Sequence, residues 1–296
     1  MVYENQIKEI GDMERKKNLF FKSFFVMLIC CLSMILFPGI KTEAASRMKQ
    51  LKVNKTYNYK LNGKKTNKIK FTQSRNGSSY YFETLKIYID GQKKLTLKSQ
   101  AYSWNVTLCK ISSSRTLLYV RDYTENDYNN LMRIYEYKNG KLTLISDLVK
   151  ISRANDWGKY SPLSSWSRGT LTSVGKNKIT VKWSETTNST GIIYVNITYK
   201  ISGANIKRKG TSYKVSLYKK NSWTARRTIK TYTKAGGGKK AFTIKTGNKV
   251  KIIKFTTKNG KRYIQIKNSK GKKGWYKDAD SSNMGKGWFK EALFAG

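Results

Sequence analysis

The sequence of 296 residues contains no histidine, and this absence removes several catalytic centres from consideration. A Ser-His-Asp triad or a Cys-His pair needs an imidazole as its base. Imidazole is also a frequent ligand of catalytic zinc. The sequence therefore excludes hydrolases that use a histidine base and zinc enzymes that use histidine ligands.

Cysteine and proline are also scarce, with three and two residues respectively. Cys30 and Cys31 lie in a hydrophobic run near the N-terminus, so the rest of the chain holds Cys109 alone and no internal disulfide is expected. Cys109 stands in the alternating segment NVTLCKIS, without a neighbouring base. Because a free cysteine of this kind is usually a small core residue, we expect Cys109 to be buried.

Acidic residues number 17, against 60 lysines and arginines. The tightest acidic cluster, in RDYTENDYNN, contains Asp122, Glu125 and Asp127. A glycosidase needs two carboxylates that face each other across a cleft, and three acids on one short loop usually do not. We expect them to cap a turn, to pair with basic neighbours or to remain from a worn ion-binding loop. We therefore expect no enzyme activity, metal or cofactor, with a cell-wall hydrolase that uses carboxylates alone as the alternative.

Positive charge is what the chain has in excess, with a net charge of +43 and a pI near 10.1. Residues 45–222 hold 34 basic and 9 acidic residues, and residues 223–296 hold 20 and 3. Both parts should attract polyanions, and such binding weakens as salt is added. Many of these lysines also fit the solvated outer faces of strands, where they hinder edge-to-edge pairing.

The first 44 residues predict a secretory signal peptide whose true start is Met13. Four basic residues precede an uncharged stretch from Phe24 to Phe37, which is short for a membrane span. Small residues follow, and cleavage is expected after Ala44 or one residue later. An uncleaved membrane anchor is the alternative, and it is the one membrane contact we expect. Export without disulfides is typical of Gram-positive bacteria, so we expect a secreted, extracellular protein.

The rest of the chain predicts an all-β protein. Tyrosine, threonine, isoleucine and lysine dominate, and apolar residues alternate with polar ones. Asn-Gly, Asp-Gly or single glycines separate the alternating runs, as in β-hairpins. No apolar period typical of a helix continues for more than two turns. Strands are expected over 67–72, 84–90, 94–99, 105–112, 116–123, 131–137, 177–184, 191–202 and 213–218.

One phrase occurs twice at a distance of 47 residues. Residues 87–97 read IYIDGQKKLTL and residues 134–144 read IYEYKNGKLTL. Each copy predicts a hairpin, because Asp90-Gly91 and Asn139-Gly140 supply residues that tolerate positive φ. A 47-residue step is close to the length of a four-stranded propeller blade. Weaker relatives of these hairpins occupy 59–72 and 172–184.

The stretch from NGKKTNKIKF to MRIYEYKNGKLTLI resembles the integrin-type propeller repeats (FG-GAP or VCBS-like) of secreted clostridial proteins. The resemblance implies a propeller-like or open β-hairpin repeat domain over residues 45–221. It also implies that an aspartate-rich loop once held calcium before the strand at 67–72. Asn67 replaces an acid there and lysines enter the loop, so this copy is expected to have lost its ion.

Residues 222–296 resemble a bacterial SH3 domain. The segments TIKTGNKVKIIKF and KRYIQIKNSKGKKGWYK match its strand pair and its closing Gly-x-x-Gly-Trp motif, here Gly271, Gly274 and Trp275. The segment RTIKTYTKAGGG stands where the family has its first strand but lacks the Arg-x-Gly-Pro signature. The resemblance implies a small SH3-like β-barrel that follows the repeat domain.

Aromatic residues around the closing motif are the candidate ligand-binding residues, because aromatic faces suit sugar rings and peptide stems. We expect a secreted, non-enzymatic protein whose SH3-like module and basic surface bind the peptidoglycan or teichoic acid of the cell wall. The alternative to wall association is an extracellular binder of other polyanions, nucleic acid or glycosaminoglycan, without sequence-specific recognition of nucleic acid. The candidate site comprises Tyr232, Tyr263, Lys273, Trp275 and Tyr276.

Overall fold

A computed structural model describes residues 47–124, 130–153, 163, 167–216, 222–280 and 287–294. Residues 1–46 form a unit separate from Arg47–Gly296, and the predicted signal peptide lies outside the described residues. None of the helices formed by the described residues has the length and apolar character required to cross a membrane. All the described residues belong to the unit Arg47–Gly296.

This unit is nearly all β-structure, as the sequence predicted, and its one described helix, α2, spans Leu148–Ser152. Most predicted strands are present, two of them with unchanged bounds at 116–123 and 191–202. The strands in chain order are β1 (Met48–Gln50), β2 (Tyr57–Lys60), β3 (Thr66–Ser74), β4 (Phe82–Ile89), β5 (Gln92–Ala101), β6 (Ser103–Lys110), β7 (Thr116–Tyr123), β8 (Met132–Lys138), β9 (Lys141–Asp147), β10 (Gly169–Gly175), β11 (Lys178–Thr187), β12 (Gly191–Ser202), β13 (Asn205–Arg208), β14 (Ser212–Ser216), β15 (Trp223–Thr224), β16 (Ile229–Lys234), β17 (Gly237–Ile244), β18 (Lys249–Lys258), β19 (Lys261–Asn268) and β20 (Lys273–Lys277).

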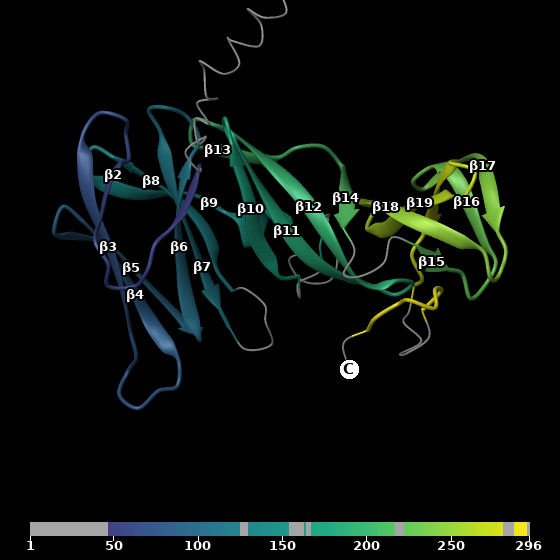
Figure 1. Ribbon diagram of the computed structural model, residues 1–296, viewed down its shortest axis with the longest axis horizontal. Coiled ribbons are helices and arrows are strands. Elements are labelled where there is room, and N and C mark those ends of the chain that lie inside the picture. The colour runs from purple at the N-terminus through teal and green to yellow at the C-terminus, as the bar shows by residue number, and fades with distance from the viewer. Residues whose placement is uncertain are drawn as a thin grey trace, which may run out of the picture. The chain divides into compact units, whose positions relative to one another are not determined.

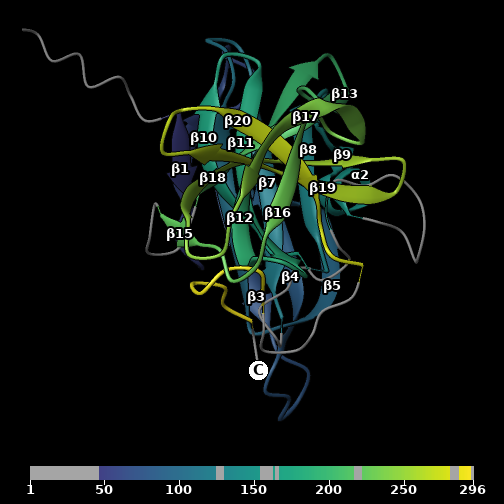
Figure 2. The same cartoon turned by 90° about the vertical axis from the view of Figure 1, so that its right-hand side faces the viewer.

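These strands form three antiparallel sheets, none of which closes on itself among the described residues (Figure 1). The outer sheet has the order β2-β3-β4-β5, and the middle sheet has the order β1-β6-β7-β8-β9. The long sheet has the order β10-β11-β12-β14-β18-β19-β20-β16-β17, with β13 beside β12 and β15 beside β18. In the turned view of Figure 2, the C-terminal strands β16 to β20 face the reader.

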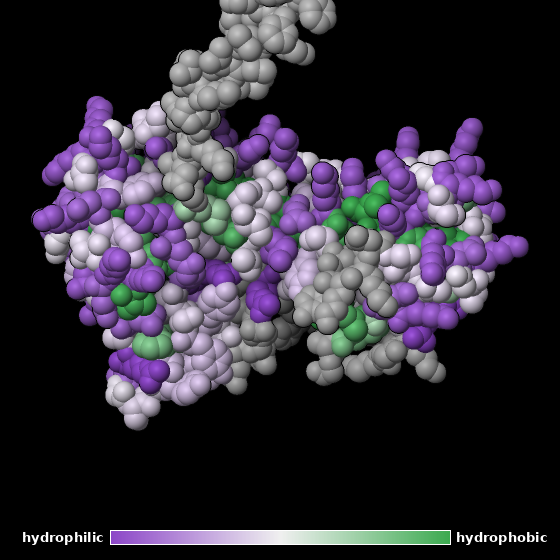
Figure 3. Space-filling view, viewed as in Figure 1, coloured by the Kyte–Doolittle hydropathy of each residue, from purple (hydrophilic) through white to green (hydrophobic). Residues whose placement is uncertain are grey.

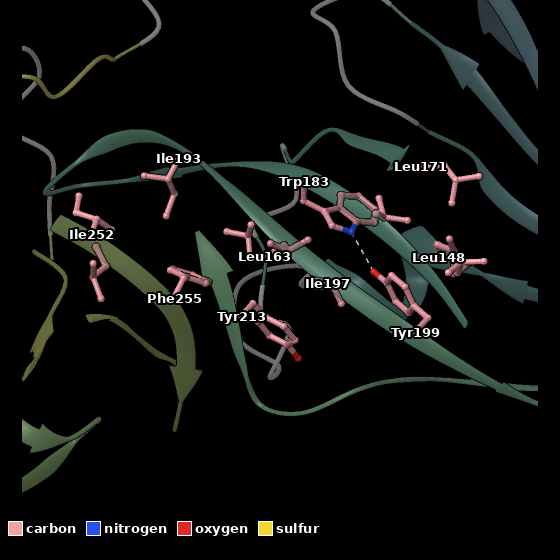
Figure 4. Packing of buried hydrophobic residues seen from close by; sticks show 14 of the residues in the cluster. Leu148, Leu163, Leu171, Trp183, Ile193, Ile197, Tyr199, Tyr213, Ile252 and Phe255 are labelled. Atoms are coloured by element: carbon pink, nitrogen blue, oxygen red, sulfur yellow. Dashed lines mark hydrogen bonds between the residues drawn. The ribbon is translucent and has the colours of Figure 1, made fainter. Parts of the chain in front are cut away.

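The centre of the middle sheet is buried on both faces, as β7 shows. Leu118 and Val120 belong to the core shared with the outer sheet, whereas Leu117 and Tyr119 belong to the core shared with the long sheet. Successive side chains of a strand point to opposite faces, so β7 contributes alternately to two cores. The second core continues through Trp183, whose indole N–H donates to the Tyr199 hydroxyl at 3.0 Å (Figure 4).

The two copies of the repeated phrase form equivalent hairpins in neighbouring sheets. The copy at 87–97 joins β4 to β5, and the copy at 134–144 joins β8 to β9. Each hairpin therefore links the last two strands of a four-stranded antiparallel series. The weaker relatives at 59–72 and 172–184 link β2 to β3 and β10 to β11 instead, which are the first two strands of their series. The repeated phrase therefore has a structural role, since each copy forms a hairpin between two paired strands.

The repeated turns have the backbone conformation that the sequence predicted. Asp90 and Gly91 have φ values of 53° and 78°, and Asn139 and Gly140 have values of 51° and 73°. Two consecutive positive φ values define the tight turn that matches the twist of paired strands. Asp90 does more than turn the chain, because its carboxylate accepts hydrogen bonds from the Asn67 side chain at 2.9 Å and from the Lys68 backbone N–H at 2.8 Å. In this way Asn67, predicted to lie in a lost ion loop, ties β3 to the β4–β5 turn.

The long sheet continues across the predicted domain boundary at residue 221. Strand β14 pairs with β12 on one side and with β18 on the other, through Ser212–Thr256 and Lys214–Lys254. The connection at 217–221 lies outside the described residues, so the division into two domains stays a prediction. Backbone hydrogen bonding nevertheless makes the strands of both regions parts of one sheet.

Candidate functional site

Strand β20 separates the two adjacent aromatic residues of the predicted site. Trp275 pairs with Gln265 of β19 and with Tyr232 of β16, while Tyr276 pairs with Ile264. Adjacent residues of a strand point to opposite faces. Trp275 and Tyr276 therefore cannot contribute to the same surface.

Tyr276 lies in the core of the long sheet and is 2% exposed. Its ring stacks on Trp288 at a centroid distance of 5.5 Å, and its hydroxyl is 3.1 Å from the Ser189 hydroxyl. Burial raises the pKa of the Tyr276 hydroxyl, and the neighbouring Asp278 carboxylate raises it further. Its burial and its partners indicate that Tyr276 supports the fold rather than a ligand.

The other four candidates lie together, and we call Tyr232, Tyr263, Lys273 and Trp275 the basic aromatic face. Tyr232 is opposite Trp275, and Lys273 is two residues from Trp275 on the same side of β20. Tyr263 is opposite Lys277, also two residues from Trp275. Three neighbouring strands, β16, β20 and β19, thus place these side chains on one face of the long sheet.

Exposure is uneven across the basic aromatic face. Tyr232 is 40% exposed, whereas Trp275 is 9% exposed. The turn between β16 and β17 covers part of this face, since a side chain added at Gly236 would lie 3.2 Å from the Tyr263 hydroxyl. Lys258 donates to the Ala235 carbonyl at 3.3 Å and holds the same turn. Tyr232 and the lysines around it are therefore the groups that a ligand meets first.

The glycines of the closing motif have structural tasks. Gly271 has a φ of 79°, a conformation that residues with a side chain rarely adopt. A Cβ atom at Gly274 would lie 2.4 Å from the Thr231 hydroxyl and 3.0 Å from the Phe242 ring. The motif therefore lets β20 approach the β16–β17 hairpin closely, and through that approach it sets the position of Trp275.

Lysines surround Tyr232 without carboxylate partners. Lys240 is opposite Tyr232, and Lys230 and Lys234 flank it on β16, all of them exposed. Among the described residues, no ion pair involves a lysine of β16, β17 or β18. Strongly hydrophilic side chains also dominate the right-hand end of Figure 3, where these strands lie. Unpaired positive charge around an exposed aromatic ring suits a polyanion that also offers a stacking surface.

Cys109 and Asp122 are both buried and have structural roles. Cys109 is fully buried, and burial raises the pKa of its thiol to about 12, which fits the predicted core residue. Asp122 is also buried, with its carboxylate accepting from the Leu131 backbone N–H at 2.9 Å and from the Ser99 hydroxyl at 2.6 Å. It brackets the β7–β8 connection, one of the roles expected for the acidic cluster. Glu125 and Asp127 lie outside the described residues.

Sequence reasoning did not find the polar contacts that join the first part of the long sheet to its C-terminal part and to the segment after β20. Asp278 accepts hydrogen bonds from the backbone of Asn188 and Ser189 at 3.0 and 2.9 Å, in the turn between β11 and β12. Glu185 of β11 pairs with Arg262 of β19 at 3.1 Å. These are contacts between residues about 80–90 positions apart, and no local pattern marks them.

No family model matches the sequence, and neither a curated protein nor a solved structure matches it significantly. The function must therefore be inferred from the residues and their arrangement.

Proposed function

We propose that the protein is a secreted, non-enzymatic, cell-wall-associated binding protein that engages anionic wall polymers through the basic aromatic face. In this proposal, residues 222–296 act as an SH3-like module, and the preceding sheets act as a propeller-like scaffold. Peptidoglycan and teichoic acid are the wall polymers that carry the required negative charge. Among Tyr232, Tyr263, Lys273 and Trp275, the exposed Tyr232 makes the first contact.

One observation carries this proposal: Tyr232 is exposed between lysines that have no carboxylate partner in the described part of the chain. Lysines paired with acids would contribute little to the external field, whereas unpaired ones attract polyanions over about a Debye length. The ring of Tyr232 adds a surface on which a sugar or a peptide stem can stack. Charge supplies attraction and the aromatic ring supplies a contact that salt does not screen.

The test is a sedimentation assay with purified sacculi, before and after removal of teichoic acid, over a range of salt concentrations. The chain from Ala45 onward should sediment with the sacculi at physiological salt. Lys230→Gln, Lys240→Gln and Lys273→Gln combined should reduce the bound fraction strongly at low salt. Tyr232→Ala should reduce it at high salt, where the remaining attraction is not electrostatic.

The matched control replaces the same number of exposed lysines elsewhere, Lys93→Gln, Lys138→Gln and Lys141→Gln, which changes the net charge equally. The proposal predicts a small loss of binding for this control. If both triple variants lose the same fraction, the charge acts without a dedicated face and the proposal is wrong. No sedimentation of the unaltered chain at physiological salt would also overturn it. Retention that disappears with teichoic acid would assign the ligand to that polymer.

A further inference from the structure

A second exposed aromatic cluster lies on the outer sheet, far in sequence from the basic aromatic face. Tyr80 is 70% exposed and Tyr102 is 37% exposed. Their rings meet edge to face at a centroid distance of 5.5 Å, and Tyr81 lies 5.9 Å from Tyr80 and 5.2 Å from Tyr102. The cluster occupies the β3–β4 loop, at the lower left of Figure 1, and the β5–β6 junction. Three tyrosines that pack on one another at the surface form a platform rather than scattered exposed residues.

The residues that line an open hollow of about 600 Å³ stand on both sides of this cluster in the sequence. Glu83 is two residues from Tyr81, and Gln100 is two residues from Tyr102, so the hollow and the cluster lie at the same end of β4 and β5. The strand register shifts between Phe82 and Thr84, so that β5 holds one extra residue opposite Glu83. Such a bulge redirects side chains out of the regular ladder. The hollow is lined by Arg75, Asn76, Glu83, Thr84, Lys98, Ser99 and Gln100.

The strand ends around the hollow are anchored to the middle sheet. The Trp104 indole donates to the Phe82 carbonyl at 2.8 Å, and the Tyr102 backbone N–H donates to the Tyr123 carbonyl at 2.6 Å. Ser99 donates its hydroxyl to the buried carboxylate of Asp122 at 2.6 Å. These bonds fix the backbone on both sides of the bulge, so a ligand would meet preorganised groups.

Glu83 has a property that no other described carboxylate shares. Every other aspartate or glutamate in the described ranges takes part in a hydrogen bond or an ion pair, and Glu83 has none. In a chain with 60 basic residues, an acid without a partner is unexpected. Because the Ser99 hydroxyl already donates to Asp122, it offers only its lone pairs to the hollow. The Glu83 carboxylate and the Ser99 hydroxyl oxygen can therefore both accept hydrogen bonds from hydroxyl groups.

We propose that this hollow binds a neutral, hydroxyl-rich sugar chain, with a pyranose ring stacked on the exposed face of Tyr80 and with Tyr102, whose ring is nearly perpendicular, at the side of that ring. Glu83 and Ser99 accept hydrogen bonds from ring hydroxyls, while Asn76 and Gln100 supply amide donors and acceptors. Arg75 and Lys98 also line the hollow, so the salt dependence of binding is what distinguishes a neutral ligand from an anionic one. An apolar peptide is disfavoured because binding would bury the Glu83 carboxylate without a partner. The site is separate from the basic aromatic face, and its ligand is recognised without net charge.

The test is isothermal titration calorimetry of the chain from Ala45 onward with chitotetraose and, separately, with cellotetraose. Measurements at 0.5 M NaCl suppress attraction that depends on charge. At least one tetrasaccharide should bind with a dissociation constant in the millimolar range or below, and added salt should leave that constant unchanged. Tyr80→Ala and Tyr102→Ala should each weaken binding about five- to tenfold, as expected for loss of an aromatic contact. Glu83→Gln should weaken it by a similar factor, because a neutral amide is a poorer acceptor than a carboxylate.

Tyr88→Ala, at a half-buried tyrosine of β4 that does not line the hollow, is the matched control and should leave tetrasaccharide binding unchanged. Tyr232→Ala, on the basic aromatic face, is measured beside it to locate the binding. Tyr80 is mostly exposed, so its replacement should also leave the urea midpoint of unfolding unchanged, which keeps a loss of binding interpretable. No detectable binding of either tetrasaccharide would overturn the inference. An equal loss in Tyr232→Ala, or a dissociation constant that rises with salt, would assign the binding to the basic aromatic face instead. The sacculus assay can succeed or fail independently of this result.

Discussion

The middle sheet and the C-terminal strands share one alternating sequence pattern, but they differ in how many faces of a strand are buried. In β7 both sets of alternate residues are buried, because a sheet lies against each face. In β19, Ile264 and Ile266 are buried while Tyr263, Gln265 and Lys267 remain partly accessible on the other face. In β7, packing against the two neighbouring sheets covers both faces of the strand. In β19, one face stays accessible, and its lysines and aromatic residues can contact a ligand.

The largest expected effect tests this difference directly. Leu117→Ala and Leu118→Ala, on opposite faces of β7, should each lower the free energy of unfolding by about 2–5 kcal/mol, since each leaves a cavity in a core. In β19, Ile264→Ala should have an effect of this size and Gln265→Ala an effect within about 0.5 kcal/mol. Urea denaturation followed by tryptophan fluorescence measures all four. A small effect of either leucine variant would show that β7 has one packed face.

A second prediction concerns the ion pair between the two regions of the long sheet. Arg262 is 31% exposed, but its partner Glu185 is fully buried at the side chain. Arg262→Met should lower the free energy of unfolding by about 1.5–3 kcal/mol, because it removes one charged partner from a buried carboxylate. The control Lys277→Met breaks the exposed pair with Asp280 and should have a much smaller effect, because solvent screens that pair.

The form of the transition is informative as well. A single transition in Arg262→Met would indicate that the regions before and after residue 221 unfold as one unit. Two separate transitions would indicate independent domains joined by the β14–β18 pairing. Equal effects of Arg262→Met and Lys277→Met would contradict the importance of burial at Glu185.

The all-β class and most strand positions could be predicted from the sequence, because alternation and Asn-Gly or Asp-Gly turns are local signals. The buried state of Cys109 was expected because a free cysteine without a neighbouring base is usually a core residue. The two-sided burial of β7 could not be predicted in this way, since TLLYVRDY gives no indication of which sheets cover it. Strand geometry implies that the adjacent residues Trp275 and Tyr276 point to opposite faces of the sheet. The closing motif nevertheless suggested that both belong to one binding site.

The hollow beside Glu83 had a weak local signal that the analysis of motifs did not use. Tyr80 and Tyr81 stand in the Gly- and Ser-containing stretch NGSSYYF, where a loop is expected, and bulky residues in a loop tend to be exposed. Tyr102, however, is 21 positions further on, and only strand pairing brings it to the other two. The isolation of Glu83 depends on where every other acid finds its partner, which is a tertiary property.

A third prediction compares the two copies of the repeated phrase. Asn139→Ala should cost about 1–2 kcal/mol, because alanine is strained at positive φ. Asp90→Ala has the same strain and also removes the hydrogen bonds to Asn67 and Lys68, so it should cost about 1 kcal/mol more. Asp90→Asn and Asn139→Asp, which retain a side chain that tolerates this conformation, serve as controls. Equal costs in the two alanine variants would show that the Asn67 contact adds no stability.

The smallest expected effect is a difference in how two aspartates change stability with pH. Burial raises the pKa of Asp122 above 3.8, so the folded state keeps this proton to a higher pH than the unfolded state. Its contribution to stability is therefore complete below pH 3.8 and decreases as pH rises through the folded-state pKa. Asp90 behaves in the opposite way, since hydrogen bonds from Asn67 and Lys68 lower its pKa and its contribution is lost as pH falls. The free energy of unfolding of Asp122→Asn, relative to the unaltered protein, should increase between pH 3 and pH 6, and that of Asp90→Asn should decrease. Urea unfolding at half-unit steps of pH measures both, and the same sign for the two variants would refute the assignment of opposite environments to these carboxylates.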